Sequence, residues 1–277
     1  MRRWYGLYPP LNEYRRNFLQ SQVDCIKTNR LFFKIFQYFK LHLIHQFFKM
    51  NHFQQTLENP VWHALNETHQ NFALVYDTVQ FYNPEICPFG AFTNASKTKD
   101  ALTAYSKLTN DFFLVSENGM PTFDENYVVL NKKMEGCQMV MNDLIEVEIT
   151  ETIVPLNETH IQEIYNLIWL VMPGYYQKRT FDMGDYFGIF KNGKLIAISG
   201  QRMQTNDFIE VSGVVTHPDF TRQGFAKQLI THTTKEILKT GKHAILHTTK
   251  GNPAISLYES LGFELTRDMN WWFFNRK

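Results

Sequence analysis

The sequence predicts a protein of the α/β class, and three features of its second half support this. Residues 226–239 place apolar side chains at helical spacing, on one face. The flanking runs 208–216 and 243–248 are β-rich and short enough for strands. Upstream, Asn192-Gly193 separates two further β-rich runs and is typical of a type I′ hairpin turn. Together these features predict strands that form a sheet, with helices packed against it.

The elements of the second half follow in a regular order. A helix after Asn157 or Thr159, either of which can cap it, has Ile161, Ile164 and Ile168 on one face. Pro173-Gly174 ends this helix. The remaining predictions are strands at 144–154, 186–190, 194–203, 208–216 and 243–248, helices at 226–239 and 254–261, and final strands within 263–274.

The first half has weaker signals. Asn59 and Pro60 are a cap and a first-turn proline, so a helix is expected to begin there. Short strands are predicted at 72–76 and 112–116, a helix at 100–108, and a turn at Asn118-Gly119. No catalytic constellation is recognisable between residues 59 and 140.

Residues 1–50 differ from the rest of the chain. The segment 31–50, LFFKIFQYFKLHLIHQFFKM, is rich in Phe and Lys. Each apolar residue contributes about −0.3 to −0.6 kcal/mol to membrane insertion, but Lys34 and Lys40 cost about 2.5 to 3.5 kcal/mol each, so a transmembrane helix is rejected. A poorly ordered extension, an amphipathic or loosely docked helix, and an over-long start with Met50 as the true initiator all remain open.

Composition excludes several function classes. The net charge of the 277 residues is +1 and no basic tract stands out, so nucleic-acid binding is not expected. The three cysteines, Cys25, Cys87 and Cys137, are widely spaced, which predicts neither a disulfide framework nor a zinc cluster. A reducing, cytoplasmic location fits best.

The stretch from Glu210 to Gln228 predicts an anion-binding site. A β-rich run ends at Thr216, Pro218 interrupts it, and a polar turn with Gly224 then opens the helix. The first-turn amides of a helix have no internal partners, and the helix dipole favours an anion there. A strand, a glycine loop and a helix in this order are typical of phosphate binding.

A second motif follows at 252–263, NPAISLYESLGF. Together the two motifs closely resemble the acetyl-CoA signatures of the GNAT superfamily of N-acetyltransferases. The resemblance is good from about Ile145 to the end and weaker from about Asn59. There, NPVWHAL and PFGAF resemble a subgroup in which a reduced GNAT-like half precedes the active one. The resemblance implies the GNAT fold, a mixed and mostly antiparallel sheet flanked by helices. It implies a reduced GNAT-like half (51–142) and a catalytic GNAT domain (143–277), which follow the compositionally distinct extension (1–50).

The resemblance implies acetyl-CoA as cosubstrate. The backbone at Val214 and Thr216 would pair with the pantetheine arm, an amide near Val215 would polarise the thioester oxygen, and Asn252 would hold the arm from the other side. The pyrophosphate would bind the amides of the loop, which comprises Arg222, Gln223, Gly224, Phe225, Ala226 and Lys227. Thr221 stands where the family has Gln or Arg, which implies weaker cofactor affinity.

Two side chains are candidates for proton transfer. Tyr258 matches the family's tyrosine and, with an ordinary pKa near 10, can protonate a departing thiolate of pKa about 8.5. The alternative is an ordinary aromatic on a helix face. Glu210 occupies the place of a general-base glutamate in several members. The alternative for Glu210 is a solvated strand residue.

The expected function is transfer of an acetyl group from acetyl-CoA to a primary amine by direct attack, between strands that separate after Val215. Two alternative functions are a non-catalytic CoA-binding sensor or scaffold and an amino-acid N-acyltransferase that uses a longer acyl-CoA. The loop 172–185 lies where the family shapes its acceptor site. His217 precedes Pro218 and is expected to be exposed, while His243 and His247 lack a third ligand, so no metal site is expected. The acceptor amine and the oligomeric state stay open.

Overall fold

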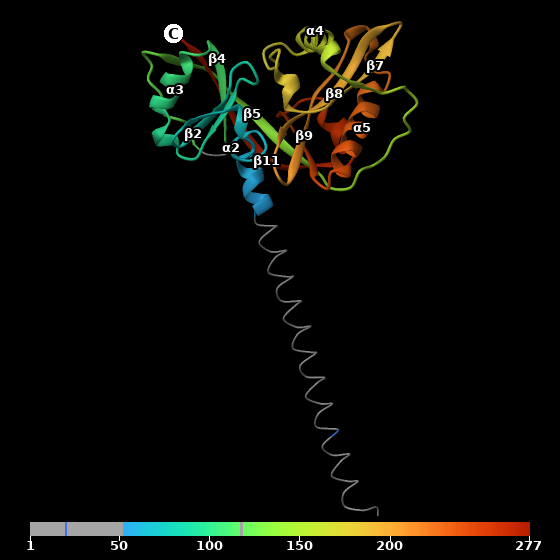
Figure 1. The fold of residues 1–277 in the computed structure, drawn as a ribbon, viewed down its shortest axis with the longest axis horizontal. Helices are drawn as coiled ribbons and strands as arrows, with labels where there is room; N and C mark the ends of the chain where they lie inside the picture. The colour runs from blue at the N-terminus through green and yellow to red at the C-terminus, as the bar shows by residue number, and fades with distance from the viewer. Residues whose placement is uncertain (1–19, 21–51, 117–118) are drawn as a thin grey trace, which may run out of the picture. The chain divides into compact units, whose positions relative to one another are not determined.

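The computed structural model describes residue 20 and residues 52–116 and 119–277 (Figure 1). The chain divides into two units, residues 1–54 and residues 55–277. The predictions for residues 1–50 lie almost entirely outside the described residues, as does Asn118 of the predicted turn. No helix in the described ranges is both long and apolar enough to span a membrane.

Residues 55–277 are built on one mixed sheet whose strand order is β1-β2-β3-β4-β11-β5-β10-β9-β8-β7-β6 (Figure 1). Antiparallel pairs predominate, and β3–β4 and β9–β10 are parallel. The strands are β1 (Ala73–Tyr76), β2 (Val79–Tyr82), β3 (Phe89–Phe92), β4 (Asp111–Ser116), β5 (Val128–Met141), β6 (Val154–Leu156), β7 (Tyr186–Lys191), β8 (Lys194–Gln204), β9 (Phe208–Thr216), β10 (His243–Thr249) and β11 (Phe263–Arg276).

The two longest strands, β5 and β11, are exchanged between the halves of the chain. Each is 14 residues long, and they pair antiparallel from Met141 with Phe263 to Val128 with Arg276. The other edge of β5 pairs with β10 of the second half, whereas the other edge of β11 pairs with β4 of the first half. Each half therefore completes its part of the sheet with a strand from the other half.

The helices cover both faces of this sheet. Tyr186 packs beneath α4 (Ile161–Val171), whereas the next residue, Phe187, packs beneath α5 (Phe225–Lys239). Successive strand residues point to opposite faces, so α4 and α5 lie on opposite sides. In the same way Trp271 joins the core beside α2 (Pro60–Asn66), and Trp272 the core beside α3 (Lys99–Ser106). A short helix, α6 (Ile255–Glu259), precedes β11.

Most predicted elements of the second half are confirmed. Residues 208–216 form β9 with the predicted bounds, and α5 begins one residue earlier than predicted. The type I′ turn is confirmed, because Asn192 and Gly193 both have positive φ, of 52° and 75°. Two details are wrong: residues 144–153 are not a strand, and residues 263–276 form one long strand instead of several. Asn59 does not cap α2, because its side chain donates to the Phe92 carbonyl oxygen.

Candidate functional site

The loop before α5 has the geometry of an anion site. Residues 221–224 are exposed, and Gly224 is the N-cap of α5 with a φ of 79°. A glycine cap has no side chain that could satisfy the first-turn amides. A Cβ placed on Gly224 would meet no heavy atom within 4 Å, so the space above this backbone is open. Arg222 also has a positive φ, of 62°, which turns the chain sharply into the helix.

This loop follows an opening between two parallel strands. The pairing of β9 with β10 stops at Glu210 with Ile245, so the β10-facing edge of β9 has no strand partner beyond that point. The predicted separation after Val215 is therefore wrong, because the strands part five residues earlier. Gly213, with a φ of 61°, lies where the register between β8 and β9 shifts. Val214, Val215 and Thr216 lie along this opening.

Asn252 and Tyr258 come from the segment after β10. Asn252 accepts a hydrogen bond from the Ala254 amide at 2.9 Å and donates one to Thr248 Oγ1 at 2.7 Å. Its second amide hydrogen is not used by either bond. Tyr258 is half-buried, and its ring meets Phe263 edge-on at 6.4 Å. Burial first, and then the nearby Cys137, raise the pKa of Tyr258, so the phenol keeps its proton.

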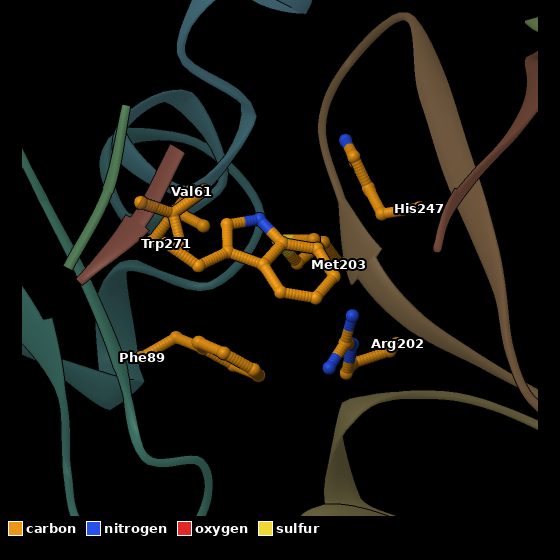
Figure 2. A pocket seen from close by; sticks show the side chains of 7 residues that line it. Val61, Phe89, Arg202, Met203, His247 and Trp271 are labelled. Carbon is orange, nitrogen blue, oxygen red and sulfur yellow. The ribbon is translucent and has the colours of Figure 1, made fainter. Parts of the chain in front are cut away.

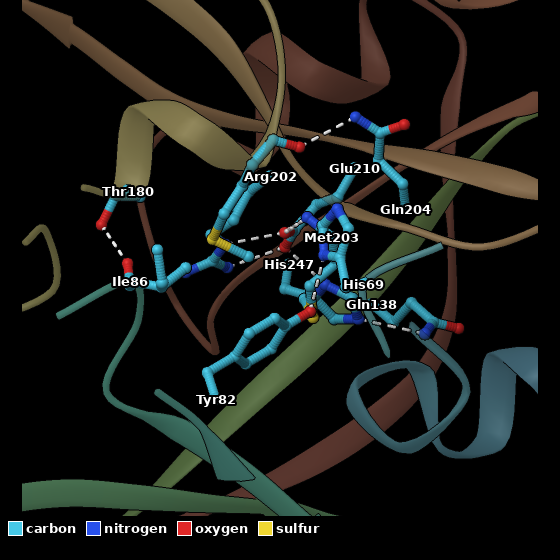
Figure 3. A network of polar contacts seen from close by, with 11 residues as sticks. His69, Tyr82, Ile86, Gln138, Thr180, Arg202, Met203, Gln204, Glu210 and His247 are labelled. Carbon is cyan, nitrogen blue, oxygen red and sulfur yellow. Dashed lines mark hydrogen bonds and ion pairs between the residues drawn. The ribbon is translucent and has the colours of Figure 1, made fainter. Parts of the chain in front are cut away.

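A polar row crosses four neighbouring strands at the same opening (Figure 3). Arg202 on β8 donates from Nε and Nη2 to the two carboxylate oxygens of Glu210 on β9, at 2.8 Å each. His247 Nδ1 on β10 lies 2.8 Å from Glu210 Oε1. On β5, Gln138 Nε2 lies 3.0 Å from His247 Nε2 and donates to the Leu57 carbonyl oxygen at 2.9 Å.

The row fixes the tautomer of His247. The carbonyl of Leu57 can only accept, so the group of Gln138 that faces it is the amide nitrogen. That nitrogen also donates to His247 Nε2, which must then accept. The proton of a neutral His247 therefore sits on Nδ1 and is donated to Glu210. This arrangement leaves Nε2 as the basic nitrogen.

Glu210 is fully buried, so the predicted alternative of a solvated strand residue is wrong. Burial alone raises the pKa of a carboxyl group, but the charge and hydrogen bonds of Arg202, followed by those of His247, outweigh burial and lower the pKa of Glu210 to about 2. The Met203 amide is a further donor, at 3.3 Å. A carboxylate held this way accepts protons poorly, which disfavours the predicted role of Glu210 as the base itself.

A small pocket lies beside the polar row (Figure 2). His247 and Arg202 reach it, whereas Glu210 does not line it. The lining residues come from five strands and a helix of both halves and are Val61, Phe89, Val115, Arg202, Met203, His247 and Trp271. Trp271 lies flat on β5 because Gly136 has no side chain there, and a Cβ on Gly136 would meet the ring at 2.9 Å.

The loop 172–185 helps to form the wall behind this pocket. Tyr175 and Met183 pack into the same core as Phe89, Met203 and Trp271. Thr180 Oγ1 donates to the Ile86 carbonyl oxygen of the first half at 2.6 Å.

The histidines considered in the sequence lie away from this pocket, except His247. His217 is half-buried, contrary to expectation, and its Nε2 lies 3.0 Å from Lys194 Nζ. His243 lies at the exposed start of β10. Residues that could together ligate a metal are absent from the described ranges.

Sequence reasoning predicted roles for the loop, Asn252 and Tyr258 but missed most of the polar row. Arg202, Gln138 and the use of His247 as a partner of Glu210 were not predicted. The alternation of β8 and β9 could have placed Arg202 beside Glu210, because antiparallel neighbours on one face contact each other. No local signal could have placed Gln138, since β5 reaches this site only through the strand exchange.

Comparisons with known proteins agree with this geometry. Residues 186–272 match the family model of FR47-like proteins. The chain also resembles the structure of a protein described as a GNAT-family acetyltransferase from Novosphingobium aromaticivorans, with 26% identity over 80% of this chain and 98% of that chain, at a TM-score of 0.71. The chain therefore has the fold of the GNAT superfamily and resembles its members.

Other structures share the GNAT fold at lower identity. A GCN5-related N-acetyltransferase-like protein from Streptococcus suis has 14% identity, covers 77% of this chain and 92% of its own, and gives a TM-score of 0.55. A protein of unknown function from Staphylococcus epidermidis has 10% identity, covers 74% and 94%, and gives 0.52. No curated protein matches the chain.

Proposed function

We propose that this protein is an N-acetyltransferase that moves the acetyl group of acetyl-CoA directly to a primary amine. The observation that carries the proposal is the loop at 221–227, where open first-turn amides of α5 stand at the end of a strand that has parted from its neighbour. The likeness to the Novosphingobium aromaticivorans protein, which is described as an acetyltransferase, supports it.

The residues present fit a CoA molecule. The pyrophosphate would accept hydrogen bonds from the amides of Arg222 to Lys227, since the open space above Gly224 lets an anion approach the backbone. The pantetheine arm would lie along the free edge of β9 at Val214, Val215 and Thr216, like an added strand. Asn252 would donate its unused amide hydrogen to the arm from the β10 side.

We assign the general base to His247 and the role of holding it to Glu210. His247 lines the pocket, and its Nε2 is the basic nitrogen of the polar row. An acceptor amine would take the place of Gln138 on Nε2, while Gln138 keeps its bond to Leu57. Glu210, ionised at any pH above about 2, would then stabilise the imidazolium that forms.

These residues account for every bond and proton change of the acetyl transfer. The amine nitrogen attacks the thioester carbonyl carbon, a carbon–nitrogen bond forms and the carbon–sulfur bond breaks. The amine proton passes to His247 Nε2. The thiolate takes a proton from Tyr258, whose phenol is protonated at neutral pH. The tyrosinate regains its proton from solvent, and His247 releases one, so no covalent enzyme intermediate is needed.

The first test is calorimetric binding of acetyl-CoA to the wild type and to Gly224→Glu. The added carboxylate would occupy the anion site, so binding should be lost. Gly241→Glu is the matched control, because Gly241 lies just past the other end of α5 with a φ of 77° and equally open space. Binding that survives in Gly224→Glu, or is lost equally in both variants, would refute the loop. An amine screen by thiol release then separates an enzyme from a CoA-binding sensor.

A further inference from the structure

Arg202 uses only one edge of its guanidinium group for Glu210. That edge, Nε with one Nη2 hydrogen, makes the two 2.8 Å bonds to the carboxylate. The opposite edge carries Nη1 and the second Nη2 hydrogen. Within the described part of the chain, Nη1 makes no hydrogen bond, although the side chain is only 13% exposed. Nη1 is not one of the fully enclosed unpaired atoms, so a ligand can reach this donor edge.

The free edge of Arg202 borders the pocket, and Figure 2 shows the guanidinium pointing into it beside Trp271. Phe89 stacks on the guanidinium, with its ring centre 4.9 Å away. Apart from Arg202 and His247, the lining side chains are apolar, and none of them is acidic. The pocket has a volume of only about 10 Å³, close to the room that one water needs. It suits only a small end group that accepts hydrogen bonds, and the rest of such a ligand must extend out of the pocket.

The two polar side chains of the pocket are close neighbours. Arg202 Nη2 and His247 Nδ1 both contact the same oxygen, Glu210 Oε1, at 2.8 Å. The outer atoms of the two side chains, Arg202 Nη1 and His247 Nε2, are the ones left for a ligand, so one small molecule could engage both residues. An amine and a carboxylate carried by one small molecule meet this condition.

We propose that the acceptor is a small amino acid, whose carboxylate binds the free edge of Arg202 while its amine faces His247. This inference rests on the proposed acetyl transfer and names its substrate class. Arg202 prefers a carboxylate because a planar guanidinium edge binds two oxygens at once. Glu210 already neutralises part of the charge of Arg202. The carboxylate of the ligand would therefore bind the guanidinium edge that faces away from Glu210. Arg202 is thus a specificity-determining residue.

The test compares matched acceptors with and without the negative charge. For glycine against glycinamide, and alanine against alaninamide, we expect kcat/KM to be about 10- to 100-fold higher for the acid, the usual worth of a charged hydrogen bond. In Arg202→Lys this preference should fall to near one, because an ammonium group keeps the charge beside Glu210 but has no second donor edge. Affinity for CoA should not change.

A second variant covers the case in which Arg202→Lys folds poorly. The double change Arg202→Met with Glu210→Gln removes both charges together, which cores tolerate far better than a single buried charge. Binding of N-acetylglycine and of N-acetylglycinamide to the CoA-loaded protein, by calorimetry, gives a readout that needs no turnover. The wild type should bind the acid more tightly, and both variants should lose this difference.

The outcomes separate the two proposals. Equal use of acid and amide, or a preference that Arg202→Lys retains, overturns the amino-acid acceptor and leaves acetyl transfer standing. If no amine is acetylated by a protein that binds CoA, the proposed function fails. In that case discrimination between the two acetylated ligands still supports a carboxylate site at Arg202, and its absence overturns that site as well.

Discussion

Replacing Glu210 with glutamine tests the polar row through stability. Glutamine keeps the shape of the side chain but leaves Arg202 buried without a counter-charge. The pKa of Glu210 is lowered from its ordinary 4.5 to about 2, and each unit is about 1.4 kcal/mol, so the ionised form contributes about 3 kcal/mol at neutral pH. Breaking a buried ion pair typically costs about 3–5 kcal/mol, which agrees with this value.

The difference in folding stability between the wild type and Glu210→Gln should decrease as the pH falls. The folded pKa lies below the unfolded one, so the contribution is complete above about pH 4.5 and is lost as the pH falls through about 2. The wild type should exceed Glu210→Gln by about 3 kcal/mol at pH 7 and by only about 1 kcal/mol at pH 3.

Urea denaturation followed by circular dichroism at both pH values measures this difference. With a slope of about 3 kcal/mol per molar urea, the midpoints should differ by about 1 M at pH 7 and by less than half of that at pH 3. The exposed Glu125→Gln is the control and should match the wild type at both pH values. Equal midpoints at pH 7, or a gap that does not shrink in acid, would refute the assignment of Glu210 as an ionised partner of Arg202.

Two further predictions follow from the site and the sheet. Tyr258→Phe should lower kcat at least tenfold and leave the affinity for acetyl-CoA unchanged, because the substitution removes the proposed acid and not a cofactor contact. Stopped-flow detection of the released thiol measures kcat. An unchanged kcat would exclude Tyr258 as the acid. Residues 55–142 and 143–277, produced separately, should each fail to unfold cooperatively, since each then lacks both neighbours of its longest strand. Cooperative unfolding of either fragment alone would contradict the shared sheet.

Local signals were enough for the cofactor side of the site. The helical period of 226–239, the glycine at 224 and the Asn-Gly hairpin all act within a few residues, so they predict structure without knowledge of the rest of the chain. Residues 144–153 were misread as a strand because their apolar residues alternate, although Ile145 is exposed and its amide instead binds the Leu261 carbonyl oxygen.

The acceptor side could not be predicted in the same way. Arg202 and His247 lie 45 positions apart, and only the register of three neighbouring strands brings them to one carboxylate. Gln138 and Trp271 reach the site through the exchange of β5 and β11, which leaves no pattern in either strand alone. Long-range pairing of this kind depends on topology, and composition and spacing do not encode it locally.

The exchange of β5 and β11 also changes what the first half is for. That half has no recognisable cofactor loop of its own, yet it supplies the strand between β10 and β11 and, through Val61, Phe89 and Val115, one wall of the pocket proposed for the acceptor. Surface residues of the first half can vary, but the half cannot be lost. The second half has no other strand that could take the place of β5 between β10 and β11. Under the proposed function, substitutions in the first half can therefore change the choice of acceptor while the proposed cofactor loop of the second half stays unchanged.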